Sequence, residues 1–286
     1  MQKYFSKFAA FAALSVALSA TAVQAEELKK VTGLKTPESV IADKKGHIFI
    51  SEIGEFGKDG DGQISVVGKD GKLSVFAKGL DDPKGLAIIG DDLYVADNHR
   101  IIKITPNGKW QVFVAASAFP EQPQFLNDLE RDLAGKYLYV SDSGDLKGKG
   151  GAIYRISLDG KVTTVINQAG DARVQGPNGL LMDDTGEVLT YVDFVSGILY
   201  TLNFKSGKLT DVAEGFGGGD GVVHHPNGLI YVSDWKNGKV FSVHHDQVKL
   251  IKDGFKAAAD IALSADGKYI LVPDMTAGEL IWLPLK

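Results

Sequence analysis

The stretch Lys84-Gly-Leu-Ala-Ile-Ile-Gly-Asp-Asp-Leu-Tyr-Val-Ala-Asp97 decides the fold, because recognisable copies of it return along the chain. Each copy has a polar first residue, an apolar run, a turn and a second apolar run that mostly ends in an acid. Six copies are present, with their first residues about 40 to 51 positions apart. We call these first residues the lead residues: Glu38, Lys84, Asn127, Asn178, Asp220 and Asp260. A period of this length is typical of β-propeller blades.

Within each copy the apolar pattern predicts four short strands and no helix. In the second copy these are residues 86–89, 93–96, 101–105 and 110–114, and Gly, Asp, Asn or Pro separates them. Tight turns such as Asn107-Gly108 allow positive φ at the glycine and make neighbouring strands antiparallel. We therefore expect an all-β fold, a six-bladed β-propeller.

The last copy contains only three strand signals before the chain ends. Residues 28–34 precede the first lead residue and can supply the missing fourth strand. The N-terminal strand would then pair with the last blade and close the ring, which removes an open sheet edge. No Pro/Ser-rich linker interrupts the copies, so residues 26–286 are expected to form a single domain.

The first 25 residues have the pattern of a cleaved signal peptide, with two lysines, an apolar run and small residues at the end. Nothing later approaches the roughly 20 apolar residues of a membrane span. We therefore expect a periplasmic or secreted protein without a membrane span after cleavage. The chain has no cysteine, which excludes disulfides and thiolate chemistry. Cleavage would take the net charge from −5 to −7, which disfavours nucleic acid as a partner.

The lead residues are expected to face one another, because the first strand of each propeller blade lines the central channel. Three carboxylates and two carboxamides would then meet one lysine, and such a buried cluster is costly without a ligand. One divalent cation would satisfy it. Oxygen ligands favour Ca²⁺, our first choice, with Mg²⁺, Mn²⁺ or Zn²⁺ as alternatives. A water-filled polar mouth, in which Lys84 pairs with a carboxylate, is the other interpretation.

Four pieces of sequence resemble the gluconolactonase, regucalcin and senescence-marker (SMP-30) family of six-bladed propellers. They are Pro177-Asn-Gly-Leu180, Asn127-Asp128, Asp220-Gly221 and Glu38. The resemblance implies that Glu38, Asn127, Asn178 and Asp220 hold one divalent cation. It also implies metal-dependent hydrolysis of a lactone or related ester, a small-molecule substrate, with Asp220 as the catalytic proton-transfer group.

Loop residues near the expected mouth are candidates for a substrate pocket: His99, Arg100, Phe125, Phe194 and Trp235. Phe125 occupies a position where family enzymes often carry an arginine. An acid ends the second strand in all six copies, Asp in five and Glu52 in the other, and this repetition predicts a structural task in the adjacent loops. The alternative function is a non-catalytic propeller with a structural cation, which binds a small ligand or an exported partner protein.

Overall fold

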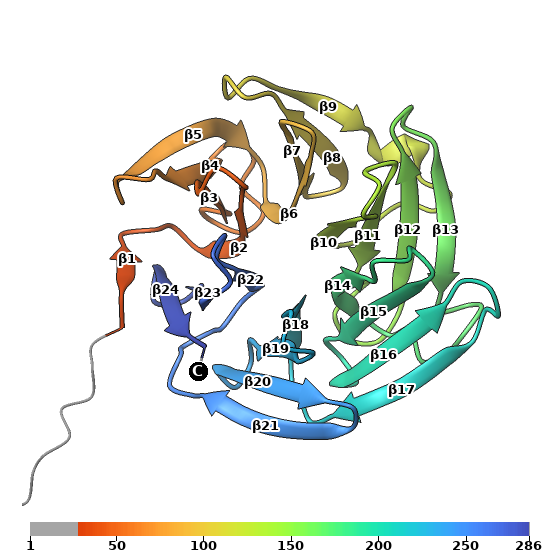
Figure 1. The fold of residues 1–286 in the computed structure, drawn as a ribbon. Coiled ribbons are helices and arrows are strands. Elements are labelled where there is room, and N and C mark those ends of the chain that lie inside the picture. The colour runs from red at the N-terminus through yellow and green to blue at the C-terminus, as the bar shows by residue number, and fades with distance from the viewer. Residues whose placement is uncertain (1–27, 286) are drawn as a thin grey trace, which may run out of the picture.

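A computed structural model describes residues 28–285, and it confirms an all-β, six-bladed β-propeller (Figure 1). The first five blades each consist of four sequential antiparallel strands. Their strands are β2 (Pro37–Ala42), β3 (Ile48–Glu52), β4 (Gly62–Val67) and β5 (Leu73–Leu80); β6 (Pro83–Ile89), β7 (Asp92–Asp97), β8 (Arg100–Ile104) and β9 (Trp110–Val114); β10 (Leu126–Arg131), β11 (Tyr137–Asp142), β12 (Ala152–Ser157) and β13 (Val162–Asn167); β14 (Pro177–Met182), β15 (Val188–Asp193), β16 (Ile198–Asn203) and β17 (Leu209–Glu214); and β18 (Gly219–His224), β19 (Ile230–Asp234), β20 (Lys239–His244) and β21 (Gln247–Lys252). A short 3₁₀ turn, Ala116–Ala118, connects the second and third blades.

The sixth blade combines both ends of the chain, as the missing strand predicted. It contains β22 (Ala262–Leu263), β23 (Tyr269–Asp274), β24 (Glu279–Pro284) and β1 (Lys30–Thr32). β1 pairs with β24, with Lys30 opposite Ile281 and Thr32 opposite Glu279. Figure 1 shows β1 beside β24 in this blade. The innermost strand β22 spans two residues, whereas the innermost strands of the other blades span six or seven.

The hydrophobic core is divided among the interfaces between blades. In the described residues the buried apolar side chains form six clusters, one for each pair of neighbouring blades. The second strands contribute most regularly: Val95, Val140 and Val232 are all fully buried. Because every blade is packed on both faces, its inner strands read as nearly continuous apolar runs.

The lead residues stand at β-bulges. In the first five blades the register of the innermost strand shifts beside the lead residue, as between Leu126 and Leu129 in β10. A bulge re-aims a side chain and leaves one backbone N–H without a ladder partner. Serines on the second strands accept that N–H in three blades: Ser39 N donates to Ser51 Oγ (2.9 Å), Asp128 N to Ser141 Oγ (2.9 Å) and Gly221 N to Ser233 Oγ (2.7 Å).

Glycines that follow lead residues let neighbouring first strands approach closely. A Cβ at Gly179 would lie 2.2 Å from the carbonyl oxygen of Asp220, and one at Gly221 would lie 2.3 Å from Ile261 N. Any side chain at these positions would therefore push the blades apart at their inner edge. The Asn-Gly and Asp-Gly pairs of the sequence thus bring the lead residues of blades 4, 5 and 6 together.

The acids at the ends of the second strands have the predicted structural task. Asp193 accepts hydrogen bonds from Gln175 N (3.0 Å) and Gly176 N (2.8 Å), which lead into its own blade. Its other oxygen accepts from Val195 N and Ser196 N in the following turn. Glu52, Asp97, Asp142 and Asp274 likewise accept backbone N–H groups of the entering loop.

The closing strand generates a prediction. A chain that starts at Gly33 loses β1, and we expect it to be less stable than a chain starting at Leu28 by about 2–4 kcal/mol, since each lost hydrogen bond contributes about 1 kcal/mol. The exposed β24 edge should also promote self-association. Urea unfolding and size-exclusion chromatography measure the two effects, and equal stability with a monomeric shorter chain would contradict ring closure by β1.

Candidate metal centre at the channel mouth

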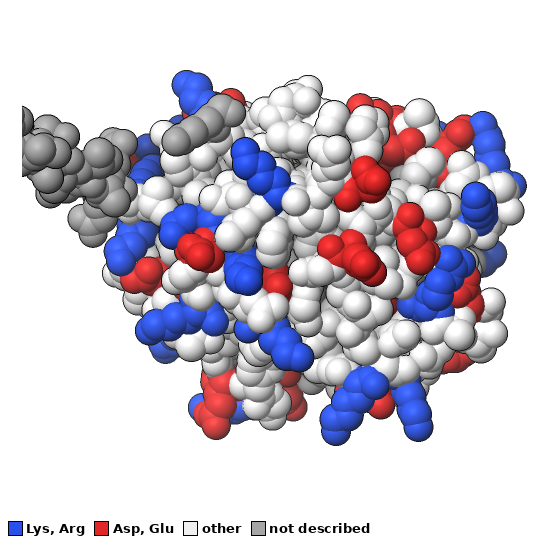
Figure 2. All heavy atoms as spheres, turned by 90° about the horizontal axis from the view of Figure 1, so that it is seen from below, with Lys and Arg blue, Asp and Glu red and all other residues white. Residues whose placement is uncertain are grey.

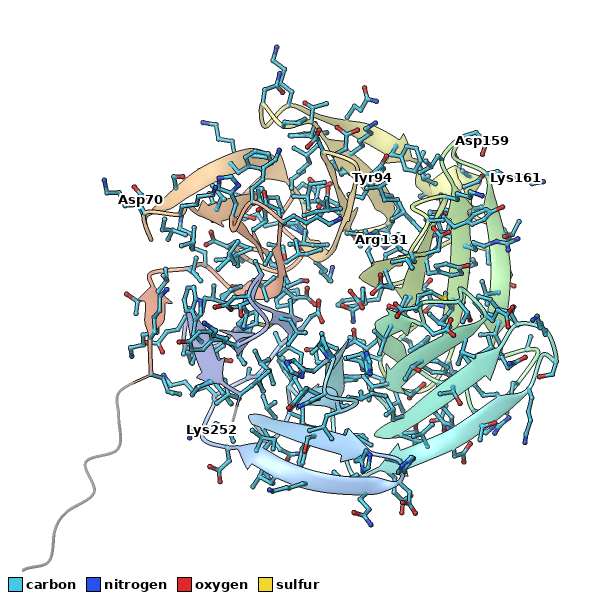
Figure 3. All side chains as sticks on the ribbon, viewed as in Figure 1. Asp70, Tyr94, Arg131, Asp159, Lys161 and Lys252 are labelled. Carbon is cyan, nitrogen blue, oxygen red and sulfur yellow. The ribbon has the colours of Figure 1, made fainter. Side chains whose placement is uncertain are left out.

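The six lead residues lie at one end of the central channel, where the first strands begin. Figure 3 shows inner-strand side chains gathered around the axis, whereas Asp70, Asp159 and Lys252 lie at the periphery. The lead residues are all buried, with exposed fractions of 2 to 8%. Contacts connect them around the ring: Asn178 Nδ2 donates to Asp220 Oδ1 (3.0 Å), and the backbone N–H of Asp260 donates to the carbonyl of Glu38 (3.0 Å).

Three of the four residues predicted as ligands carry a buried oxygen without a hydrogen-bond partner in the described structure. These atoms are Glu38 Oε2, Asn127 Oδ1 and Asn178 Oδ1. The amide nitrogens are occupied, because Asn127 Nδ2 donates to Ser143 Oγ (3.1 Å) and Asn178 Nδ2 to Asp220. Both amides therefore turn their oxygens away from these protein partners. Unpartnered buried oxygens are costly, and a cation would relieve that cost.

Two further buried carboxylates in the cluster are engaged by the protein. Asp128 accepts from Leu129 N and from Leu180 N of the next blade, both at 2.6 Å, and Asp260 accepts from Ser39 Oγ at 2.5 Å. Among the described residues, no group of three or more His, Cys, Asp or Glu side chains is arranged to hold a metal. The residues that fit a cation here are instead a mixed set of two carboxylates and two carboxamides, typical hard-cation donors.

The electrostatics of the cluster are unfavourable as it stands. Burial raises the pKa of Glu38 well above its ordinary range; the Asp220 charge adds to the rise and the Lys84 ammonium opposes it. Burial also raises the pKa values of Asp220 and Asp260, with the Asp128 charge as the next cause. Burial lowers the pKa of Lys84, and Glu38 opposes that shift. One ammonium therefore stands among several carboxyls that burial disfavours as anions.

Lys84 and Phe125 form a contact that the sequence did not predict. The Lys84 ammonium lies 4.4 Å from the centre of the Phe125 ring and donates to the carbonyl of Asp82 (3.1 Å). The aromatic face thus stabilises the buried Lys84 ammonium beside the cluster of lead residues. Phe125, which was predicted to line the substrate pocket, is half-buried, and its ring contacts the Lys84 ammonium.

The other predicted pocket residues divide into two groups. Phe194 and Trp235 are half-buried neighbours whose ring centres lie 6.1 Å apart, in the loops that follow the second strands of blades 4 and 5. Arg100 is held by ion pairs of 2.8 Å to Asp81 and to Asp97. His99 is half-buried and lies near Asp142, whose pKa burial raises against the opposing effect of backbone N–H groups and, last, of His99.

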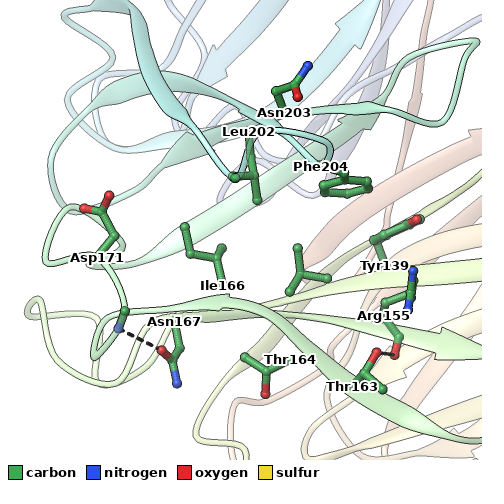
Figure 4. Close-up of a pocket in the computed structure, with 13 residues that line it drawn as sticks. Tyr139, Arg155, Thr163, Thr164, Ile166, Asn167, Asp171, Leu202, Asn203 and Phe204 are labelled. Carbon is green, nitrogen blue, oxygen red and sulfur yellow. Dashed lines mark hydrogen bonds between the residues drawn. The ribbon is translucent and has the colours of Figure 1, made fainter.

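A groove lies away from this mouth, between blades 3 and 4 (Figure 4). It has a volume of about 490 Å³ and is lined by β13 and by residues such as Tyr139, Arg155 and Phe204, and no residue predicted for the site belongs to it. On the face drawn in Figure 2, acidic and basic side chains are interspersed. Residues 28–285 contain no helix long and apolar enough to cross a membrane.

Asp128 and Glu130 are acids of the inner strand β10 that the repeat did not predict, since neither is a lead residue. Burial raises the pKa of Asp128 to about 6 and that of Glu130 to about 8. Glu130 accepts the N–H of Arg131 at 2.6 Å. The signal that could have identified them is the charge itself: Asn-Asp-Leu-Glu places two acids on an inner strand, where the other blades have mainly apolar residues.

The chain resembles known proteins in part of its sequence and in its fold. A model of the SMP-30/Gluconolactonase/LRE-like region matches residues 89–252, more than half of the chain. No curated protein matches it. Regucalcin from Agrobacterium tumefaciens strain C58, described as a calcium-binding protein, superposes with a TM-score of 0.71 and 18% identity, covering 88% of this chain and 90% of its own. A chain of a nidogen/laminin complex superposes with a TM-score of 0.62 and 19% identity, covering 76% and 79%. At these identities the two structures support the fold alone.

Glu130 gives a pH prediction. Its pKa is higher in the folded chain than the ordinary 4.5, so its contribution to stability is complete below pH 4.5 and is lost as the pH rises toward 8. Glu130→Gln should therefore be more stable than the parent by about 1–3 kcal/mol at pH 8, with the difference shrinking toward pH 5. Urea unfolding at both pH values measures this. Glu214→Gln, at the exposed end of β17, is the control; a pH-independent difference for Glu130→Gln would contradict the assignment.

Proposed function

Because the chain belongs to the SMP-30/gluconolactonase/LRE-like family, we propose that it is a divalent-metal-dependent hydrolase of a lactone or related ester. The observation that carries the proposal is the set of unpartnered buried oxygens of Glu38, Asn127 and Asn178 beside Asp220. The calcium-binding description of the regucalcin structure makes Ca²⁺ the first candidate, with Zn²⁺, Mn²⁺ and Mg²⁺ as alternatives.

Glu38, Asn127, Asn178 and Asp220 would hold the cation through side-chain oxygens. When bound, a divalent cation supplies Lewis-acid polarisation of the ester carbonyl and stabilises the negative charge that develops on its oxygen. The amide orientations are already set by the contacts of Asn127 with Ser143 and of Asn178 with Asp220. The ligand oxygens are therefore held in place before a cation arrives, which lowers the cost of binding.

Asp220 is the proposed proton carrier. One of its oxygens accepts from Asn178, and the carboxylate is buried at the mouth. As a general base it would take a proton from water as the water oxygen bonds to the carbonyl carbon. It would return that proton to the alkoxide when the ester C–O bond breaks, so that a lactone yields the hydroxy acid. Asn178 keeps the carboxylate oriented through both transfers.

Export is part of the same proposal. Residues 1–25 have the pattern of a signal peptide, and they lie outside the described residues. The absence of cysteine is compatible with an oxidising compartment, because no thiol is present to oxidise. We propose a periplasmic or secreted location for the single propeller domain, residues 26–286.

Metal binding can be tested without activity. We expect millimolar CaCl₂ to raise the melting temperature of the protein by several degrees, because a ligand that binds only the folded state stabilises it. Glu38→Gln should lose most of this increase. The same variant should be more stable than the parent without metal, since it removes a buried carboxylate whose ionised form is disfavoured. Differential scanning calorimetry with and without EDTA measures both, with Glu214→Gln as control. A full calcium response in Glu38→Gln would remove Glu38 from the ligand set.

Catalysis is tested through Asp220. The parent should hydrolyse at least one compound in a panel of aldonolactones, γ-lactones and aryl esters with Ca²⁺, Mn²⁺ or Zn²⁺. Asp220→Asn keeps an oxygen ligand but cannot carry the proton, and we expect kcat to fall about 10²- to 10⁴-fold with the calcium response of the melting temperature retained. Asp246→Asn, in an exposed turn, is the matched control. A folded, metal-binding parent that turns over none of the panel would favour a structural cation in a binding propeller.

A further inference from the structure

The residue directly after each second-strand acid is held beside the loop that leads to the lead residue of the same blade. Its backbone N–H donates to a carbonyl in the loop that enters the same blade: Phe194 N to Gly176 O (2.8 Å), Trp235 N to Gly218 O (2.9 Å) and Met275 N to Ala257 O (2.9 Å). These carbonyls belong to residues two or three positions before the lead residue. Around the ring this position is occupied by Ile53, Asn98, Ser143, Phe194, Trp235 and Met275.

The composition of this position is uneven around the mouth. Three consecutive blades, those of Asn178, Asp220 and Asp260, present Phe194, Trp235 and Met275, which are all half-buried and partly open to solvent. We call these three residues the apolar arc. In the preceding blades the position holds Asn98 and Ser143, and Ile53 is fully buried. The apolar surface therefore follows one side of the mouth only.

Side-chain contacts join the arc into one surface. The Phe194 and Trp235 ring centres are 6.1 Å apart, and Trp235 Nε1 donates to Met275 Sδ at 3.2 Å. Gly218 gives the Phe194 ring its space: a Cβ there would lie 3.4 Å from Phe194 Cε2 and 2.6 Å from Lys236 Cβ. The ring therefore reaches over the backbone that leads to Asp220.

The arc offers little to a hydroxyl-rich ligand. The indole N–H of Trp235 is already used by the Met275 sulfur, and the rings and thioether have no other donor. The guanidinium of Arg100, another residue predicted for the pocket, is held by Asp81 and Asp97. Aromatic and thioether surfaces bind alkyl and aryl groups through apolar burial and dispersion.

We propose that the mouth accepts a lactone or ester with an alkyl side chain, which lies along the apolar arc while the ester group reaches the lead residues. The substrate class is therefore an apolar lactone rather than a polyhydroxylated one. This inference rests on the proposed function for its ester chemistry. Contact between an alkyl chain and the apolar arc does not require hydrolysis, so it can be measured by binding alone.

The test uses γ-lactams, amide analogues of γ-lactones that resist hydrolysis, with side chains of zero, four and six carbons. Isothermal titration in CaCl₂ should give a Kd that falls about two- to fourfold for each added methylene, since a buried CH₂ favours binding by up to about fourfold. Trp235→Ala should reduce this dependence on chain length by at least half. Trp110→Ala is the matched control, because Trp110 lies on the outer strand β9, and it should keep the parental dependence.

Phe194→Ser provides a second variant with the same expected result if Trp235→Ala does not fold. A Kd independent of chain length in the parent, a dependence unchanged in both arc variants, or tighter binding of a polyhydroxylated lactam would overturn the inference. The proposed function fails separately: absence of metal-dependent hydrolysis leaves the chain-length result standing. Conversely, hydrolysis without chain-length dependence overturns only the apolar specificity.

Discussion

The structure depends on hydrogen bonds that five blades make between the acid ending the second strand and the loop that enters the first strand. A buried carboxylate such as that of Asp193 accepts two N–H groups of the entering loop and two of the following turn. One side chain thereby ties together both loops of the blade at the mouth. In three blades the preceding serine accepts the backbone N–H that the bulge leaves free, as Ser141 Oγ does from Asp128 N. These bonds determine where each lead residue stands, and the candidate metal centre is the sum of those placements.

The same arrangement concentrates charge where solvation is poor. Burial raises the pKa values of Glu38, Asp220 and Asp260, and the single ammonium of Lys84 opposes only part of the effect. A fold that needed the mouth only for packing could fill it with apolar side chains, which is often neutral or stabilising by comparison. The retained polar cluster, with its unpartnered oxygens, is the kind of local conflict that marks a functional site.

The sequence predicted the fold well because its signals are local and repeated. The six copies, led by residues such as Lys84 and Asp220, predicted the number of blades. The strand missing from the last copy predicted β1, and its bounds agree within two residues at each end. It also predicted that the lead residues meet, since all occupy one position of the repeat. It missed the Lys84 contact with Phe125 and the carboxyl of Asp128 reaching Leu180 N, because both join different blades. Such contacts depend on bulge geometry and on the distance between first strands, which no single copy encodes.

Ring closure by β1 also has a kinetic consequence. Lys30 and Glu279 form an ion pair of 3.0 Å across 249 positions of sequence. Strand β1 therefore cannot pair until β24, near the other end of the chain, has been synthesised. The ring cannot close until essentially the whole chain is available, and contacts of such long range are slow to form. Each earlier blade can assemble from sequential hairpins, and the last one alone requires both termini. If the chain is exported as proposed, this order delays the finished ring until the final strand has emerged on the far side of the membrane.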